Sequence, residues 1–221
     1  MNIASQIRKI QSEVLQYNAT LVAVTKTQPL EFLMEAYNSG CKIFGENKVQ
    51  EMVSKFEQLP KDINWHMIGH LQSNKVKFIA PFVTLIHSID SFSLLQEVNK
   101  QAIKNNRIIN CLLQVFIATE ESKFGFSENE VELILNSEEF LQLKNIKIIG
   151  LMGMASNTEN INQVKKEFQT LKLFFDLLKN TNNPSFQMQE LSIGMSGDYQ
   201  LALENGSTLI RVGSAIFGNR S

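Results

Sequence analysis

Apolar runs typical of buried strands alternate along the chain with stretches of helical periodicity. Eight short runs are apolar at successive positions, which is typical of strands buried on both faces of a parallel sheet. These runs are LVAVT (21–25), IFGE (43–46), WHMIG (65–69), LIHSI (85–89), CLLQVF (111–116), IIGLMG (148–153), ELSIG (190–194) and LIRVG (209–213). Strands of this kind with helices between them predict an α/β fold.

Helical patterns fill most of the segments between these runs. EFLMEAYNSG ends on Gly40, and VQEMVSKFEQL stops before Pro60, as helices commonly do. SFSLLQEVNKQAIKNN and SENEVELIL both open with a serine suited to an N-cap. The longest predicted helix covers about residues 158–179, and its core-facing stripe is Val164, Phe168, Leu171, Phe175 and Leu178.

Eight successive strand–helix units predict a closed (β/α)8 TIM barrel, and an open doubly wound sheet is the alternative. No linker or change in composition divides the chain, so we expect a single domain over residues 1–221. Only SAIFGNRS follows the last strand, so the eighth helix is truncated. The N-terminal segment has helical spacing at Ile3, Ile7, Ile10 and Val14, and we expect this extra helix to pack in the place of the eighth.

Composition excludes several classes of protein. The formal net charge is −1, which argues against a broad nucleic-acid surface. No apolar run reaches the length of a membrane span, and charges interrupt the N-terminal apolar residues, unlike those of a signal peptide. We therefore expect a cytoplasmic protein. Cys41 and Cys111 lie beside apolar runs without metal or redox spacing, and we expect buried free thiols.

Polar residues collect at the carboxyl ends of the predicted strands, where barrels of this kind hold their active sites. Lys26 ends the first strand, Asn47 follows the second, His70 follows the third and Met154 follows the sixth. Arg211 lies within the eighth. These residues are far apart in the sequence, but the fold would bring them to one rim.

Two glycine-containing turns predict an anion site on the same rim. Ser196 and Gly197 follow the seventh strand and precede a helical segment, YQLALENG, while Gly213 and Ser214 follow the eighth strand. The loops after these two strands are the usual phosphate site of the fold. Ordinary capping and tight turning is the alternative interpretation.

The position of Lys26 beside such a site predicts a reactive amine. An amine held among apolar walls loses solvation, so its pKa falls and part of it becomes a nucleophile. A nucleophilic lysine facing a phosphate site matches a phosphorylated aldehyde, which it would hold as a Schiff base. The alternative is a lysine that reaches the rim as a solvated cap.

Several longer motifs resemble those of a known family. They are AVTK (23–26), FGENKVQE (44–51), WHMIGHLQSNK (65–75), ESKFGF (121–126), GLMGMA (150–155) and SIGMSGDYQLALENGSTLIRVGSAIFG (192–218). From about residue 20 onward the chain is similar to the pyridoxal phosphate homeostasis proteins, single-domain relatives of the alanine racemase barrel. The resemblance implies a fold-type III barrel that stores or delivers pyridoxal 5′-phosphate in vitamin B6 homeostasis, without catalytic turnover.

The resemblance also implies roles for individual residues. Lys26 would carry the cofactor as an internal aldimine, and Arg211 would face the pyridine nitrogen. The phosphate would lie on Ser196, Gly197, Gly213 and Ser214, and the ring or its O3′ side would be flanked by Asn47, His70 and Met154. The implied partners are the cofactor and PLP-dependent apo-enzymes, and we expect a monomer.

The arginine has a chemical consequence of its own. Because arginine is always protonated and only donates hydrogen bonds, it would keep the pyridine nitrogen unprotonated. Such a ring withdraws electrons poorly, so carbanion chemistry is disfavoured. Without the resemblance, a salt bridge at the rim is an equally good interpretation of Arg211.

An amino-acid racemase is the alternative function. Racemases of this barrel type add a second, mostly β domain that supplies a catalytic tyrosine. The tyrosines here are Tyr17, Tyr37 and Tyr199, all within the expected barrel, so a two-base mechanism lacks its second base.

Three further sites are weaker candidates. The segment around Ser196 lacks the second glycine of the GxSxG elbow of serine hydrolases, because Asp198 stands there. His66 and His70 have i, i+4 spacing but straddle a strand end, so we expect His66 and His87 to pack in the core rather than bind zinc. Lys123 competes with Lys26 as the reactive lysine, but its loop position should keep it protonated.

Overall fold

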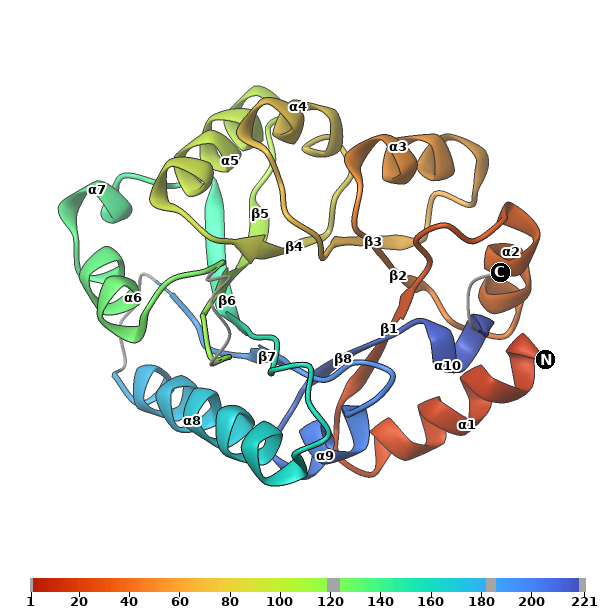
Figure 1. Cartoon of the computed structure of the whole chain (residues 1–221). Helices are drawn as coiled ribbons and strands as arrows, with labels where there is room; N and C mark the ends of the chain where they lie inside the picture. The colour runs from red at the N-terminus through yellow and green to blue at the C-terminus, as the bar shows by residue number, and fades with distance from the viewer. Residues whose placement is uncertain (1, 119–123, 182–185, 219–221) are drawn as a thin grey trace.

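The computed structural model describes residues 2–118, 124–181 and 186–218. Its eight parallel strands form a closed barrel in chain order, with β8 pairing to β1. Figure 1 shows the strands as an inner ring with the helices outside it. The strands are β1 (Thr20–Val24), β2 (Ile43–Glu46), β3 (Asn64–Met67), β4 (Leu85–Ile89), β5 (Ile109–Gln114), β6 (Ile146–Met152), β7 (Glu190–Ser192) and β8 (Leu209–Val212). The predicted barrel is confirmed, and the open sheet is wrong.

The helices follow the strands in the expected alternation. They are α1 (Ile3–Leu15), α2 (Leu30–Asn38), α3 (Val49–Gln58), the 3-10 turn η1 (Ser73–Lys75), α4 (Val76–Ile79), α5 (Phe92–Lys104), α6 (Glu128–Leu135), α7 (Glu138–Leu141), α8 (Ile161–Lys179), α9 (Tyr199–Glu204) and α10 (Ser214–Phe217). The sequence pattern does not predict η1, α4 or α7, because a single turn is too short to show helical periodicity.

Side chains that cap the helices fix where several of them begin. The hydroxyl of Ser127 accepts a hydrogen bond from the amide of Glu130, whose carboxylate returns one to Ser127 and completes a capping box. Ser91 caps α5 in the expected place. The side chain of Asn160 accepts from the amide of Gln163, so α8 begins at Ile161 rather than near 158.

The N-terminal helix takes the place of the eighth barrel helix. In Figure 1, α1 lies outside the barrel between α9 and α2, and it contacts β1 and α10. Its stripe of Ile3, Ile7, Ile10 and Val14 is buried. The hydroxyl of Tyr199 in α9 donates to Glu13 Oε2 at 2.7 Å, which ties the two helices together. The predicted packing of this helix is confirmed.

The strands separate two apolar regions. The larger one lies between the sheet and the helices, and it includes Trp65 and Phe168. The smaller one lies inside the barrel and includes Val22, which is paired in register with Arg211. Because side chains alternate along a strand, Val22 and Arg211 both point inward. The barrel interior therefore carries a buried cation as well as apolar side chains.

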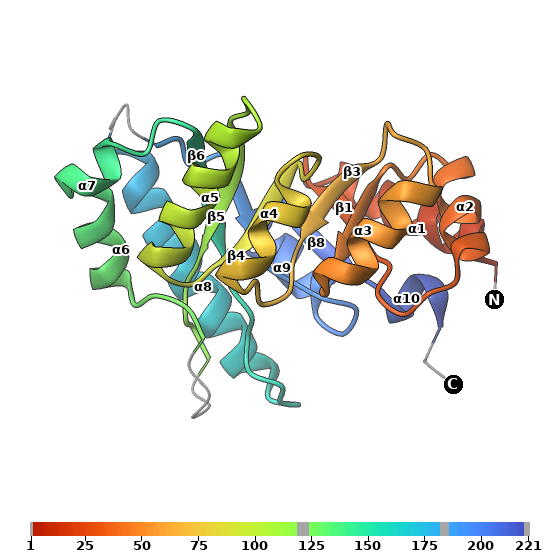
Figure 2. The ribbon, with the colours of Figure 1, turned by 90° about the horizontal axis from the view of Figure 1, so that it is seen from above.

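The carboxyl ends of the strands share one edge of the barrel. Figure 2 shows the barrel from the side, with the segment between β6 and α8 and the helix α10 along the same lower edge.

Among the described residues, no helix is both long and apolar enough to cross a membrane. Cys41 and Cys111 are buried free thiols, as expected.

Candidate cofactor site

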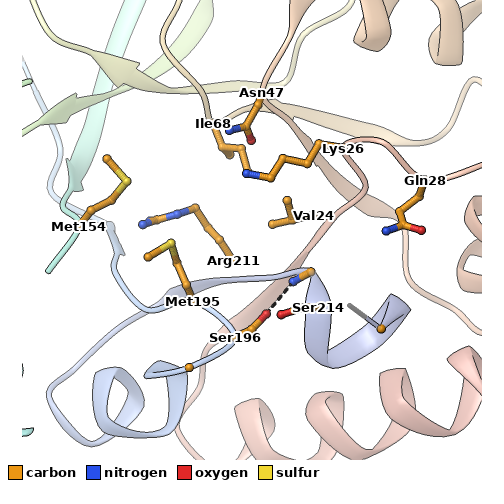
Figure 3. Close-up of a pocket in the computed structure, with 13 residues that line it drawn as sticks. Val24, Lys26, Gln28, Asn47, Ile68, Met154, Met195, Ser196, Arg211 and Ser214 are labelled. Carbon is orange, nitrogen blue, oxygen red and sulfur yellow. Dashed lines mark hydrogen bonds between the residues drawn. The ribbon is translucent and has the colours of Figure 1, made fainter. Parts of the chain in front are cut away.

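One cavity of about 510 Å³ opens at the carboxyl ends of the strands. Figure 3 shows side chains from opposite sides of the barrel pointing into it, among them Lys26 and Arg211. The residues around it come from segments far apart in the sequence and are Val24, Lys26, Gln28, Asn47, Ile68, Met154, Met195, Ser196, Gly197, Arg211, Gly213, Ser214 and Gly218. Eight of the nine residues predicted for the site line this cavity.

Lys26 enters the cavity from a turn rather than from a strand. β1 ends at Val24, one residue before the end of the predicted run LVAVT (21–25). The amide of Thr25 still bonds to Gly45 O at 3.0 Å, but Thr27 turns into the left-handed region with φ +64. The half-buried side chain of Lys26 extends toward Asn47 and Ile68 (Figure 3).

The turns after β7 and β8 meet at Ser196. Its Oγ accepts hydrogen bonds from the amides of Gly213, at 3.1 Å, and Ala215, at 3.4 Å. Figure 3 shows the bond to Gly213 as a dashed line. Within the described residues, nothing accepts from the backbone amides of Ser196, Gly197 or Ser214. These amides are therefore available to an anion in the cavity.

Gly194 lets the turn after β7 approach α9. Its φ is +92, and a Cβ atom there would lie 2.5 Å from Cβ of Ala202. The amide of Met195 donates to Asp198 Oδ1 at 2.6 Å, which closes the turn before α9. Burial raises the pKa of Asp198 above its ordinary value. The turn is thus held by its own carboxylate and packed against the helix behind it.

Arg211 lies across the inner end of the cavity. Its Nη1 donates to Ser192 O at 2.8 Å and to Ser192 Oγ at 2.6 Å, and its Nη2 donates to Gly153 O at 3.0 Å. The side chain is 4% exposed, and burial lowers its pKa to about 10, so it stays protonated at neutral pH. None of its described hydrogen-bond partners is a carboxylate, so the rim salt bridge we considered is wrong.

A chain of hydrogen bonds runs from Arg211 into the barrel interior. Ser192 Oγ lies 2.9 Å from His87 Nδ1, and His87 Nε2 lies 3.0 Å from His66 Nδ1. When the serine hydroxyl donates to His87 Nδ1, the Nε2–H of neutral His87 donates to His66 Nδ1. Burial lowers the pKa of His66 to about 3 and also lowers that of His87. Both imidazoles are therefore neutral, and both are buried in the core, as we predicted.

Asn47 and Met154 lie on opposite sides of the cavity in Figure 3. Asn47 Oδ1 is buried and finds no hydrogen-bond partner in the described part of the chain. A Cβ atom on Gly69 would lie 2.5 Å from Asn47 O, so this glycine lets the third strand end pack against Asn47. Met154 is 43% exposed at the cavity mouth.

His70 lies outside this cavity, so the structure lends no support to its predicted contact with the ring, which stays a prediction. Its Nδ1 lies 2.9 Å from Asp90 Oδ2, and its side chain is 59% exposed. It lines a separate hollow with Asp90 and Ser91. The residues after a strand end can turn either way, and here the backbone passes Asn47 and carries His70 outward.

The pattern of strand ends did not indicate Val24, Gln28, Ile68, Met195 or Gly218 as cavity residues. The apolar parts of the cavity wall include Val24, Ile68 and Met195. Their only signal in the sequence is their closeness to Lys26, Gly69 and Ser196. Lys123, the competing lysine, lies outside the described residues.

Two other kinds of site find no support in the described part of the chain. No group of three potential metal ligands comes together there. The Ser196 hydroxyl accepts from two amides, and no histidine is among the described residues that line the cavity, so the serine–histidine pair of a hydrolase is not formed there.

The comparisons with known proteins agree on one family. The model of the alanine racemase N-terminal domain matches residues 1–221. The pyridoxal phosphate homeostasis protein of Aquifex aeolicus is 42% identical over 91% of this chain and 87% of its own. The chain belongs to the pyridoxal phosphate homeostasis protein family. The resemblance seen in the motifs is therefore confirmed.

Solved structures of similar proteins have the same barrel. PipY of Synechococcus elongatus, determined without PLP, is 33% identical and matches with a TM-score of 0.91 over 98% of this chain and 100% of its own. PipY has also been determined with PLP bound, and that structure matches with a TM-score of 0.85. Alanine racemase from Bartonella henselae is 18% identical with a TM-score of 0.71, and this chain covers 58% of it. That likeness shows the shared barrel fold.

Proposed function

We propose that this member of the pyridoxal phosphate homeostasis family binds pyridoxal phosphate in the cavity and holds it covalently through Lys26. The observation that carries the proposal is the meeting of an amine with the open amides of Ser196, Gly197 and Ser214 around one cavity of about 510 Å³. A structure of PipY with PLP bound, 33% identical to this chain, supports binding of the same cofactor here. The cofactor supplies an aldehyde with which a primary amine condenses.

The residues present fit this group. The two turns after β7 and β8 offer backbone donors for a dianionic phosphate, and a Cβ atom on Gly197 would meet nothing within 4 Å. Lys26 Nζ bonds to the aldehyde carbon, and the aldehyde oxygen leaves as water. Asn47 Oδ1, buried and without a described partner, is suited to accept a hydrogen bond from a hydroxyl on the ring.

Arg211 would set the electronic state of the ring. It donates three hydrogen bonds to Ser192 and Gly153, which hold the guanidinium in place. Opposite a pyridine nitrogen, this protonated donor would keep the nitrogen unprotonated. A ring in that state stabilises negative charge at the reacting carbon poorly, which suits storage of the cofactor better than carbanion chemistry.

We propose that the chain acts as a carrier without turnover. The relatives carry the name of homeostasis proteins, and PLP-dependent apo-enzymes are the proposed recipients, served by a monomer. Among the described residues that line the cavity, Lys26 and Arg211 are the only ionisable side chains, so this part of the lining offers no second base. Loaded protein should therefore leave L-alanine unracemised in a polarimetric assay, and measurable turnover would replace the carrier with an enzyme.

Borohydride reduction followed by peptide mapping tests the covalent proposal. Pyridoxal phosphate added to the purified protein should give a yellow adduct, and reduction should fix the label on the peptide that contains Lys26. Lys26→Arg keeps the charge but removes the primary amine, so it should remain unlabelled. A label confined to Lys123 would mean that Lys26 is not the reactive amine.

A further inference from the structure

A buried lysine lies beneath the turn that carries Lys26. Lys55, in α3, is 5% exposed. Its Nζ donates to Thr25 O at 2.6 Å, to Glu46 Oε1 at 2.8 Å and to Glu51 Oε1 at 2.6 Å. Three acceptors use all three protons of the ammonium group, so its direction is fully determined.

These contacts reach the backbone on both sides of Lys26. On one side, Lys55 bonds directly to the carbonyl of Thr25, whose hydroxyl donates to Glu46 Oε1 at 2.6 Å. On the other side, Glu51 Oε1 accepts from the amide of Thr27 at 2.5 Å. The two neighbours of Lys26 are thus held by one charged cluster, which we define as Lys55, Glu46 and Glu51.

The turn held in this way is a strained one. Thr27 has φ +64, a left-handed conformation that is unfavourable for a β-branched residue. Strain of this kind persists where surrounding contacts hold the backbone in place, and it is common at functional sites. The bond from the Thr27 amide to Glu51 is a contact that maintains it, and the turn directs the residue before it into the cavity.

Stability alone does not account for the charged cluster. Glu46 is fully buried, and its Oε2 has no hydrogen-bond partner in the described residues. Burial raises the pKa of Glu46, against the opposing effect of Lys55. Replacing a buried ion pair with apolar side chains is often neutral or stabilising, so this arrangement is poorly explained as a stabilising device. Its geometry matches a need to orient one turn.

We propose that Lys55, together with Glu46 and Glu51, positions Lys26 so that its amine meets the aldehyde of a phosphorylated ligand in the cavity. The inference rests on the proposed function of Lys26 but goes beyond it. Lys55, Glu46 and Glu51 do not line the cavity, so they act through the backbone of Thr25 and Thr27. They are positioning residues, and their loss should slow the covalent step without weakening the hold on the phosphate.

Two ligands separate binding of the phosphate from the covalent reaction at Lys26. Pyridoxal 5′-phosphate reports binding and covalent reaction together, whereas pyridoxine 5′-phosphate has an alcohol in place of the aldehyde and reports binding alone. In Glu51→Gln, which lacks the charge that holds Lys55 and the Thr27 amide, the rate of reaction at Lys26 should fall about tenfold or more. The affinity for pyridoxine 5′-phosphate should stay at the wild-type value. Lys55→Met should show the same pattern.

Lys42→Met is the matched control. It removes a lysine of the same length that pairs with Asp62 at the surface, so both ligands should behave as in wild type. Thermal unfolding of each variant shows whether it is folded, and Glu51→Gln decides the matter if Lys55→Met does not fold. Unchanged reaction rates, or an equal loss for both ligands, would overturn the positioning role. A wild-type protein unlabelled at Lys26 would instead overturn the proposed function itself.

Discussion

At the scale of single residues, Gly197 separates binding of the phosphate from stability of the fold. A Cβ atom there meets nothing within 4 Å in the protein, but the residue lines the cavity. We expect Gly197→Ala to change the free energy of unfolding by less than about 0.5 kcal/mol. Its added methyl group should crowd the phosphate, so titration with pyridoxine 5′-phosphate should give a weaker affinity than wild type.

Gly194→Ala provides the contrast for this prediction. Its φ of +92 and a Cβ contact of 2.5 Å with Ala202 should cost stability as well as affinity, by about 1–3 kcal/mol of unfolding free energy. Chemical denaturation measures both variants. If Gly197→Ala bound the ligand as tightly as wild type, the phosphate would not lie against this turn.

Single residues also show where sequence reasoning about a site succeeds. Lys26, Asn47, Ser196 and Arg211 could be placed on one cavity because the fold brings all strand ends to one edge. The pattern gives no direction for a side chain that lies beyond a strand end, so it did not show that His70 lines a separate hollow. It also left Lys55 unnoticed, because a lysine in an amphipathic helix looks like a surface residue until its three acceptors are known.

At the scale of elements, the barrel could be predicted almost completely. Every predicted strand is present, and the stripe from Val164 to Leu178 in α8 is buried as expected. The differences lie at the ends, where capping and turn geometry decide, as at Asn160. Two helices of four residues, α4 and α7, were missed because tertiary contacts rather than periodicity define them.

The N-terminal helix should contribute measurably to stability. Ile7 is 0% exposed and packs into the core, so Ile7→Ala should lower the free energy of unfolding by about 2–5 kcal/mol. Leu15 on the same helix is 73% exposed, and Leu15→Ala should cost less than about 0.5 kcal/mol. Urea denaturation of the two variants compares them. Equal effects would mean that α1 does not complete the helix ring.

At the scale of the whole molecule, the two buried histidines inside the barrel make the free energy of unfolding depend on pH. His66 and His87 are neutral when folded, and burial lowers the pKa of His66 to about 3, against about 6.5 in an unfolded chain. Because folding lowers these pKa values, the neutral imidazoles contribute fully to the free energy of unfolding above pH 6.5. This contribution is lost as the pH falls toward 3. The slope should be about 1.4 kcal/mol per pH unit for each imidazole that takes up a proton on unfolding.

A conservative variant isolates this effect from the carboxylates that titrate in the same range. In His66→Gln, the amide oxygen can still accept from His87 Nε2, but one titrating imidazole is gone. Denaturant titrations between pH 4 and 7 should show a shallower decline than wild type, and buried acids such as Glu46 cancel in the difference. If His66→Gln declined as steeply as wild type, the acid sensitivity would have to come from groups outside the barrel interior.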